Sequence, residues 1–260
     1  MSHATLLESR DARGIVTLTL NRPDMHNAMD AQMMDDLAAA ASALGADTGV
    51  RAVILTGQGA SFCAGGDLGW MRKQISATRP QRMAEARRLA DMLNTLNTMP
   101  KPLIGAINGA AFGGGVGLAS VCDIALAADT AKFGLTETRL GLIPATIAPY
   151  VLARMGEGKA RRVFMSARRF DAAEALALDL VAQVVAPNAL MDAAMREAEA
   201  YLACAPGAVA AAKALARSLG APITGEVIDA TIERLADTWE NPEATEGIAA
   251  FFEKRKPGWM

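Results

Sequence analysis

The N-terminal half of the chain alternates short β-branched runs with longer segments that have helical spacing. Runs such as IVTLTL and AVILT have the length and composition of buried strands. The segments between them repeat apolar side chains every three or four residues, as on one face of a helix. This rhythm predicts an α/β core of repeated strand-and-helix units, although it would also fit a doubly wound sheet. The predicted strands are residues 15–20, 52–56, 103–107 and 123–128, and the predicted helices are residues 30–44 and 79–99.

The C-terminal part reads as mainly helical, with one further strand at 180–185. Prolines and glycines fall where one helix should end and the next begin. No low-complexity linker divides the chain. The predicted helices are residues 171–178, 190–203, 207–219, 224–237 and 242–254.

Composition excludes several classes of function. The 26 Lys+Arg nearly balance the 28 Asp+Glu, which disfavours binding to nucleic acid or to an anionic membrane surface. Cys63, Cys122 and Cys204 form no CxxC pattern, as expected for reduced thiols in the cytoplasm, and His3 and His26 have no partner at metal-ligand spacing. No apolar stretch reaches the roughly 18 residues of a membrane span. We therefore expect a cytoplasmic protein without a metal ion.

Three segments are candidates for a binding or catalytic site, because glycines or a carboxylate follow predicted strands in them. They are SFCAGGDLGWM at 61–71, NGAAFGGGVGL at 108–118 and FGLTETRLGLIP at 133–144. Glycines leave backbone N–H groups unobstructed, and a helix N-terminus presents unpaired donors. Glu137 lies among apolar residues, where burial would raise its pKa and suit it to proton transfer. Each glycine loop alone could equally be a tight connection, and Glu137 alone could be a solvated loop residue. A dinucleotide or P-loop site is less favoured because GxGxxG and the P-loop pattern are absent.

Together, five motifs resemble the enoyl-CoA hydratase/isomerase (crotonase) family in the family's order. They are NRPDMHNAMD at 21–30, SFCAGGDL at 61–68, KPLIGAINGAAFGGGVGLA at 101–119, CDIALAADTAKFGLTETRLGLIP at 122–144 and FFEKRKPGW at 251–259. The resemblance implies a spiral of repeated ββα units over residues 1–200, with the CoA and acyl site, and a C-terminal helical trimerisation region over 201–260. It also implies an acyl-CoA thioester substrate and a homotrimer or hexamer. Coenzyme A is then part of the substrate, and no separate cofactor is expected.

The resemblance also implies roles for individual residues. The backbone N–H groups of Gly66 and Gly114 would hold the thioester oxygen, and Glu137 would transfer a proton. Lys254 and Arg255 would lie near the CoA phosphates. The residues expected to contact substrate or CoA are Cys63, Ala64, Gly65, Gly66, Asp67, Leu68, Gly114 and Lys254.

One departure from the family pattern keeps the reaction open. Where family hydratases have a first glutamate, this chain has Gly117, and a single glutamate is what the family's Δ3,Δ2-enoyl-CoA isomerases use. However, DLGWMR and RLGLIPATIAPYV resemble the branch with methylglutaconyl-CoA and carboxygeranoyl-CoA hydratases, from leucine and terpene breakdown. The carboxylated substrates of that branch call for a cation, and Arg72 or Lys73 are candidates. We expect a hydratase acting on a branched or carboxylated 2-enoyl-CoA, with the isomerase second and a noncatalytic acyl-CoA or RNA-binding scaffold third.

Overall fold

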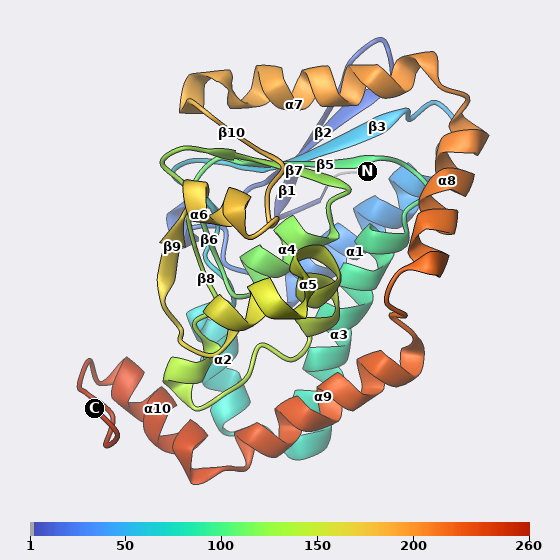
Figure 1. Ribbon diagram of the computed structural model, residues 1–260. Coiled ribbons are helices and arrows are strands. Elements are labelled where there is room, and N and C mark those ends of the chain that lie inside the picture. Colours follow the sequence, from blue (N-terminus) through green and yellow to red (C-terminus); the bar gives the residue numbers. More distant parts are fainter. Residues whose placement is uncertain (1–2) are drawn as a thin grey trace.

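The computed structural model describes residues 3–260 and is built on a six-stranded sheet (Figure 1). The strand order in this first sheet is β1-β2-β3-β5-β7-β10; β1 runs antiparallel to β2, and every other neighbouring pair is parallel. Most of these strands are buried along their length, as is usual for parallel strands. Their bounds are β1 (Leu6–Arg10), β2 (Ile15–Leu20), β3 (Ala52–Gly57), β5 (Leu103–Ile107), β7 (Ile124–Ala128) and β10 (Gln183–Val185).

A second sheet is made of four strands of three residues each, in the order β4-β6-β8-β9. The first three strands are parallel, and β9 runs antiparallel to β8. Three residues are too few to show a period of two, so the sequence pattern did not reveal these strands. Their bounds are β4 (Ser61–Cys63), β6 (Ala110–Phe112), β8 (Lys132–Gly134) and β9 (Arg169–Asp171).

The chain alternates between the two sheets, which confirms the predicted ββα spiral. Three successive turns each place one strand in the first sheet, the next strand in the second sheet, and then a helix: β3 to β4, β5 to β6, and β7 to β8. A doubly wound fold would instead keep consecutive strands in one sheet. The α-helices are α1 (Ala31–Ala46), α2 (Leu68–Ile75), α3 (Arg79–Thr98), α4 (Gly114–Val121), α5 (Ala148–Phe164), α6 (Ala172–Ala177), α7 (Leu190–Glu199), α8 (Pro206–Leu219), α9 (Gly225–Trp239) and α10 (Pro242–Phe252), and short 3-10 helices lie at η1 (Pro23–Met25), η2 (Glu137–Leu140), η3 (Pro187–Ala189) and η4 (Ala200–Ala203).

Helices cover both faces of the first sheet (Figure 1). Ile54 and Ile104 pack against α7, whereas Val53 and Leu55 face the larger core formed with α1, α3, α4 and α5. Successive strand residues point to opposite faces, so the apolar runs recognised in the sequence serve two cores at once.

One predicted strand is shorter in the structure, and one helix of the structure is absent from the prediction, each for a local reason. The strand expected at 180–185 is shortened to β10, because Leu180 and Val181 are buried in the turn that follows α6. Helix α5 was not predicted; Gly156, with φ of 72° and ψ of 153°, interrupts its helical geometry and breaks the apolar repeat.

The C-terminal helices run along the outside of the core (Figure 1). Helix α9 packs on α3 and α5, and α10 packs on η2, while α8 buries none of its residues. In the described part of the chain, residues 3–260, no helix has both the length and the apolar character needed to cross a bilayer.

Candidate active site

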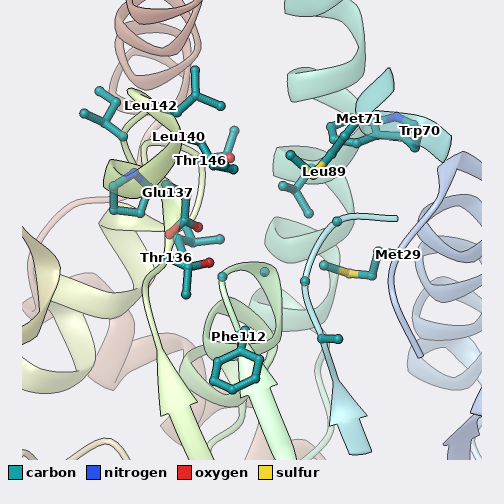
Figure 2. A pocket seen from close by; sticks show the side chains of 18 of the residues that line it. Met29, Trp70, Met71, Leu89, Phe112, Thr136, Glu137, Leu140, Leu142 and Thr146 are labelled. Atoms are coloured by element: carbon teal, nitrogen blue, oxygen red, sulfur yellow. The ribbon is translucent and has the colours of Figure 1, made fainter. Parts of the chain in front are cut away.

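Three loops meet at one edge of the second sheet. Because β4, β6 and β8 are parallel, their carboxyl ends lie side by side (Figure 2). The segments that follow are residues 64–66 after β4, Gly113 and Gly114 after β6, and residues 135–137 after β8. Ligands commonly bind beyond the carboxyl ends of parallel strands. The three glycine- and glutamate-bearing motifs of the sequence thus converge on one site.

The backbone of Gly66 is oriented by a bridge to the preceding loop. Met29 donates its N–H to the carbonyl of Gly65 at 2.7 Å, and Asp67 donates its N–H to the carbonyl of Met29 at 2.9 Å. Since successive backbone groups of an extended segment point to opposite sides, the N–H of Gly66 points away from Met29. Within residues 3–260, no acceptor receives that N–H.

The segment NRPDMHNAMD holds this loop in place. Asn27 is completely buried and donates from its side-chain amide to the carbonyls of Gln58 and Ser61, at 2.9 and 2.8 Å. Arg22 pairs with the buried Asp67 carboxylate at 3.1 Å, and Asp67 also accepts from two N–H groups at the start of α2. The motif is therefore a support for the loop that presents Gly66.

Gly114 presents the second free donor because it is the first residue of α4. The carbonyl of Gly113 already accepts from Val116 and Gly117, but the N–H of Gly114 has no acceptor in the described part of the chain. The first N–H groups of a helix lack intrahelical partners and carry the positive end of the helix dipole. This N–H is accordingly suited to stabilise a developing negative charge.

Glycines allow the two donor loops to touch. A Cβ on Gly65 would lie 3.0 Å from the carbonyl oxygen of Phe112, and one on Gly115 would lie 2.3 Å from that of Cys63. Gly113 has φ of 49° and faces the third loop, since a Cβ there would lie 2.9 Å from Glu137 Oε1. Any side chain at these positions would push the donors or the carboxylate apart.

Glu137 is the buried carboxylate of the site. The residue as a whole is half-buried, but its Oε2 atom is fully covered and has no hydrogen-bond partner in residues 3–260. Burial disfavours the charged form and raises the pKa of Glu137 from 4.5 to about 7. A carboxyl with this pKa can both accept and donate a proton near neutral pH.

These groups line a cavity of about 370 Å³, called the main cavity below. Figure 2 shows Glu137, Thr136 and Leu142 on one side and Met29, Met71 and Leu89 on the other. The walls are mostly apolar, as in many small-molecule sites. Helices α9 and α10 also contribute walls, which the sequence did not reveal, through Leu235, Trp239 and Phe251.

Gly117 does not open into the main cavity. A Cβ at this position would lie 2.5 Å from Cγ2 of Ile147, and Ile147 is itself a buried residue of the cavity wall. Gly117 lies one helical turn after Gly114, but Ile147 fills the space that a second carboxylate would need. One carboxylate, Glu137, therefore faces the two donors.

The structure brings some of the predicted CoA contacts to the main cavity and leaves others outside it. Ala64, Gly65, Gly66, Leu68 and Gly114 line the cavity. Others lie elsewhere for different reasons: Cys63 is buried, with a pKa raised by burial to about 12, Asp67 is held by Arg22, and Lys254 is exposed just beyond α10.

The cations expected from the sequence are also placed differently. Arg72 lies over the Phe252 ring at 4.7 Å, Lys73 is exposed, and neither lines the main cavity. Arg255 is held by Glu246 at 2.6 Å, which lowers the pKa of that carboxyl to about 2.

Two arginines that the sequence analysis did not select do line the main cavity, Arg139 and Arg169. Neither forms an ion pair within residues 3–260, and Arg169 lies over the Phe112 ring at 5.0 Å. Arg139 could have been found from its position two residues after Glu137 in TETRLGL. Arg169 has no comparable signal, because its strand is too short to recognise.

No cluster of three or more His, Cys, Asp or Glu side chains suited to a metal ion occurs in the described residues. The groups gathered at the main cavity are backbone donors, one carboxylate and two guanidinium groups. This set suits proton transfer next to a carbonyl group whose oxygen becomes negatively charged.

Comparison with known proteins agrees with this chemistry. The family model described as enoyl-CoA hydratase/isomerase matches residues 10–260. The chain is 37% identical over 254 residues to the mitochondrial methylglutaconyl-CoA hydratase of Mus musculus, covering 94% of this chain and 79% of the relative. A crystal structure of an enoyl-CoA hydratase from Shewanella pealeana matches with a TM-score of 0.81 and 38% identity, covering 99% and 96% of the two chains. The Pseudomonas aeruginosa protein AtuE matches with a TM-score of 0.79 and 40% identity, covering 98% and 99%.

Proposed function

Because this chain belongs to the enoyl-CoA hydratase/isomerase family, we propose that it is a hydratase that adds water to the double bond of a 2-enoyl-CoA thioester. One observation carries this proposal: the free N–H groups of Gly66 and Gly114 and the buried carboxylate of Glu137 line the same cavity. The two donors would bind the thioester carbonyl oxygen. The carboxylate would then act on the acyl carbons next to it.

The reaction can proceed with one carboxylate. Ionised Glu137 takes a proton from water as the water oxygen bonds to the β-carbon, and the electron pair of the double bond moves toward the thioester oxygen. The N–H groups of Gly66 and Gly114 stabilise the resulting enolate. Glu137, now protonated, returns the proton to the α-carbon, which completes the addition of water and restores the carboxylate.

We propose a branched or carboxylated acyl chain as the preferred substrate. Arg139 and Arg169 support this choice, because they are the cations of the main cavity and have no carboxylate partner within the described residues. Arg139 lies in the same 3-10 turn as Glu137, so we assign it the acyl carboxylate. The relative named methylglutaconyl-CoA hydratase is in accord with such a substrate.

An isomerase is the second candidate, and the packing of Ile147 over Gly117 favours it. A single carboxylate can remove a proton from one carbon and return it two carbons away, without activating water. In that case Glu137 and the two N–H groups keep the same roles, but the substrate is a 3-enoyl-CoA.

The test is to measure turnover of crotonyl-CoA, methylglutaconyl-CoA and a 3-enoyl-CoA. Fastest hydration of methylglutaconyl-CoA supports the proposal, and turnover of the 3-enoyl-CoA alone supports the isomerase.

Arg139→Met should lower kcat/KM for methylglutaconyl-CoA by at least about tenfold, since a charge-assisted hydrogen bond is lost, and should leave kcat/KM for crotonyl-CoA nearly unchanged. An equal loss for both would assign Arg139 to CoA instead. No turnover of any thioester despite tight binding would indicate a noncatalytic scaffold.

We also propose that the protein acts in the cytoplasm without a metal ion or a nucleic-acid partner. The free cysteines support the location, the balanced charge of the chain argues against nucleic acid, and proton transfer by Glu137 needs no metal ion. Turnover that is lost on treatment with EDTA and restored by a divalent ion would contradict it.

A further inference from the structure

A second cavity of about 360 Å³ lies at the opposite end of α4 from Gly114. The carboxyl ends of α3 and α4 meet there with α5 and α8. None of its lining residues lines the main cavity. Its polar lining includes Asn97, Asp123, Tyr150, Arg154 and Arg217.

Two arginines of the second cavity are fixed by the ends of helices. Arg154 donates to the carbonyl oxygens of Ser120, Cys122 and Asp123, where α4 ends. Arg217 donates one N–H to the carbonyl oxygen of Asn97 at 2.9 Å, where α3 ends. The side chain of Arg217 has no other partner within residues 3–260, so most of its donors are free.

Two further donors in this wall are buried without partners. Tyr150 is 2% exposed, and its hydroxyl group has no hydrogen-bond partner in the described residues. The side-chain nitrogen of Asn97 is likewise buried and unpaired. Burial raises the pKa of Tyr150 to about 12, so the phenol keeps its proton near neutral pH. Buried polar groups are rarely left unpaired, and both of these lie in the wall of one cavity.

The charge of the wall favours an anion. Asp123 is the one carboxylate among the lining residues, and its Oδ2 accepts from Lys213 at 2.7 Å and from the N–H of Leu103 at 2.8 Å. The positive charge of Lys213 offsets that carboxylate. Arg154 and Arg217 then leave the cavity cationic, and its unpaired groups on Arg217, Tyr150 and Asn97 can all donate.

We propose that the second cavity binds a small oxyanion, a carboxylate or a phosphate group of a metabolite. The guanidinium group of Arg217 supplies charge and paired donors, and the hydroxyl of Tyr150 and the amide of Asn97 donate to the remaining oxygens. This site is separate from the main cavity and does not depend on the proposed reaction.

Fluorine NMR on the intact protein tests the proposal, because the chain has 2 tyrosines, Tyr150 and Tyr201. Both are replaced by fluorinated tyrosine, and Tyr201→Phe identifies the Tyr150 signal. Inorganic phosphate and acetate are titrated separately at constant ionic strength, with sodium chloride as reference. We expect a saturable shift of the Tyr150 signal and not of the Tyr201 signal. A shift with phosphate alone assigns the site to phosphate groups, and a shift with acetate alone assigns it to carboxylates.

Arg217→Gln should weaken the apparent affinity for the active anion by at least about tenfold, since it removes charge-assisted hydrogen bonds. The matched control is Arg161→Gln, an exposed arginine of α5 paired only with Glu157. Tyr150→Phe keeps the ring and should diminish the rise in unfolding temperature that the anion produces. The proposal is overturned by equal anion affinity in wild type and Arg217→Gln, by an equal anion-induced temperature rise in Tyr150→Phe, or by the absence of any saturable shift.

Discussion

The carboxyl group of Glu137 lies in a wall that offers its Oε2 atom no hydrogen-bond partner among the described residues. Its pKa is raised by burial to about 7, so the fraction of ionised carboxylate changes steeply across neutral pH. Both candidate reactions begin with the ionised form. The protonation of one side chain therefore governs the forward rate.

From this follows a pH dependence. We expect kcat/KM to rise with pH and to level off above an apparent pKa near 7, because kcat/KM reports ionisations of the free enzyme. An ordinary solvated glutamate would place that limb near 4.5. The measurement is kcat/KM on the best substrate between pH 5.5 and pH 8.5, a range of about three orders of magnitude in proton activity around that pKa. A rate independent of pH over this range would argue against Glu137 as the base.

Ile147 is the second residue with a specific consequence, because it occupies the space beside Gly117. Gly117→Glu alone should impair folding or activity, since its Cβ would collide with Ile147. Gly117→Glu combined with Ile147→Ala should instead admit a second carboxylate and raise kcat for crotonyl-CoA hydration by about tenfold or more, within the range of general acid–base catalysis. Ile147→Ala alone is the control. If the double variant is no faster than this control, the vacated space does not position a second base.

At the scale of elements, the first turn of α4 and the loop after β4 act as one unit. Gly65 and Gly115 permit backbone contacts that a side chain would prevent, and the bridge at Met29 directs the N–H of Gly66 away from its own supporting loop. The sequence motifs identified which residues form this unit. They could not supply the bridge, because it joins positions 29 and 66 through backbone atoms alone.

The donor at Gly114 can be removed with little change to the helix. Proline is well tolerated at the first position of a helix, where the N–H has no helical partner. Gly114→Pro should lower kcat by about 10²–10³, the usual effect of losing one oxyanion donor. Gly114→Ala is the matched control: its Cβ also displaces the Met29 side chain, which would lie 2.2 Å away, but it keeps the N–H.

Circular dichroism must show that both variants are folded. Equal turnover in Gly114→Pro and Gly114→Ala would mean that this N–H does not bind the thioester oxygen, and that displacement of Met29 explains any loss.

At the scale of the whole molecule, the ββα spiral explains why distant motifs meet. Three successive turns each deliver one strand to the second sheet, and the loops that follow parallel β4, β6 and β8 lie at a common edge. The long strands of the first sheet could be predicted because their apolar runs are continuous. The short strands of the second sheet could not, although they position the site.

The site likewise has residues that the sequence could predict and residues that it could not. Glu137, Gly66 and Gly114 were selected from motifs, and the structure gathers them at one cavity. The walls from α9 and α10 and the cation at Arg169 depend on long-range packing that no local pattern encodes. Arg72 was favoured by its nearness in sequence, but it lies over Phe252 outside the main cavity.

We propose that helix α8 contributes to the assembly of the molecule. It buries no residue of its own and exposes Leu215 and Leu219, at 60% and 80%. Exposed apolar side chains of this kind favour burial against another copy. We expect a homotrimer or hexamer, measured as molar mass by light scattering during gel filtration. Leu219→Glu should shift the distribution toward smaller species, and a wild-type protein that elutes as a monomer would contradict the proposed assembly.

Among the described residues, Glu137 is the single carboxylate that lines the main cavity together with the two backbone donors, and its role in proton transfer is the central claim. Steady-state kinetics of Glu137→Gln on the best acyl-CoA substrate tests this most directly, because glutamine keeps the shape of the side chain and removes its proton-accepting group. We expect kcat to fall by at least about 10²-fold, the lower end of general acid–base contributions, with a much smaller change in KM. A folded Glu137→Gln variant that keeps most of the wild-type kcat would contradict the account.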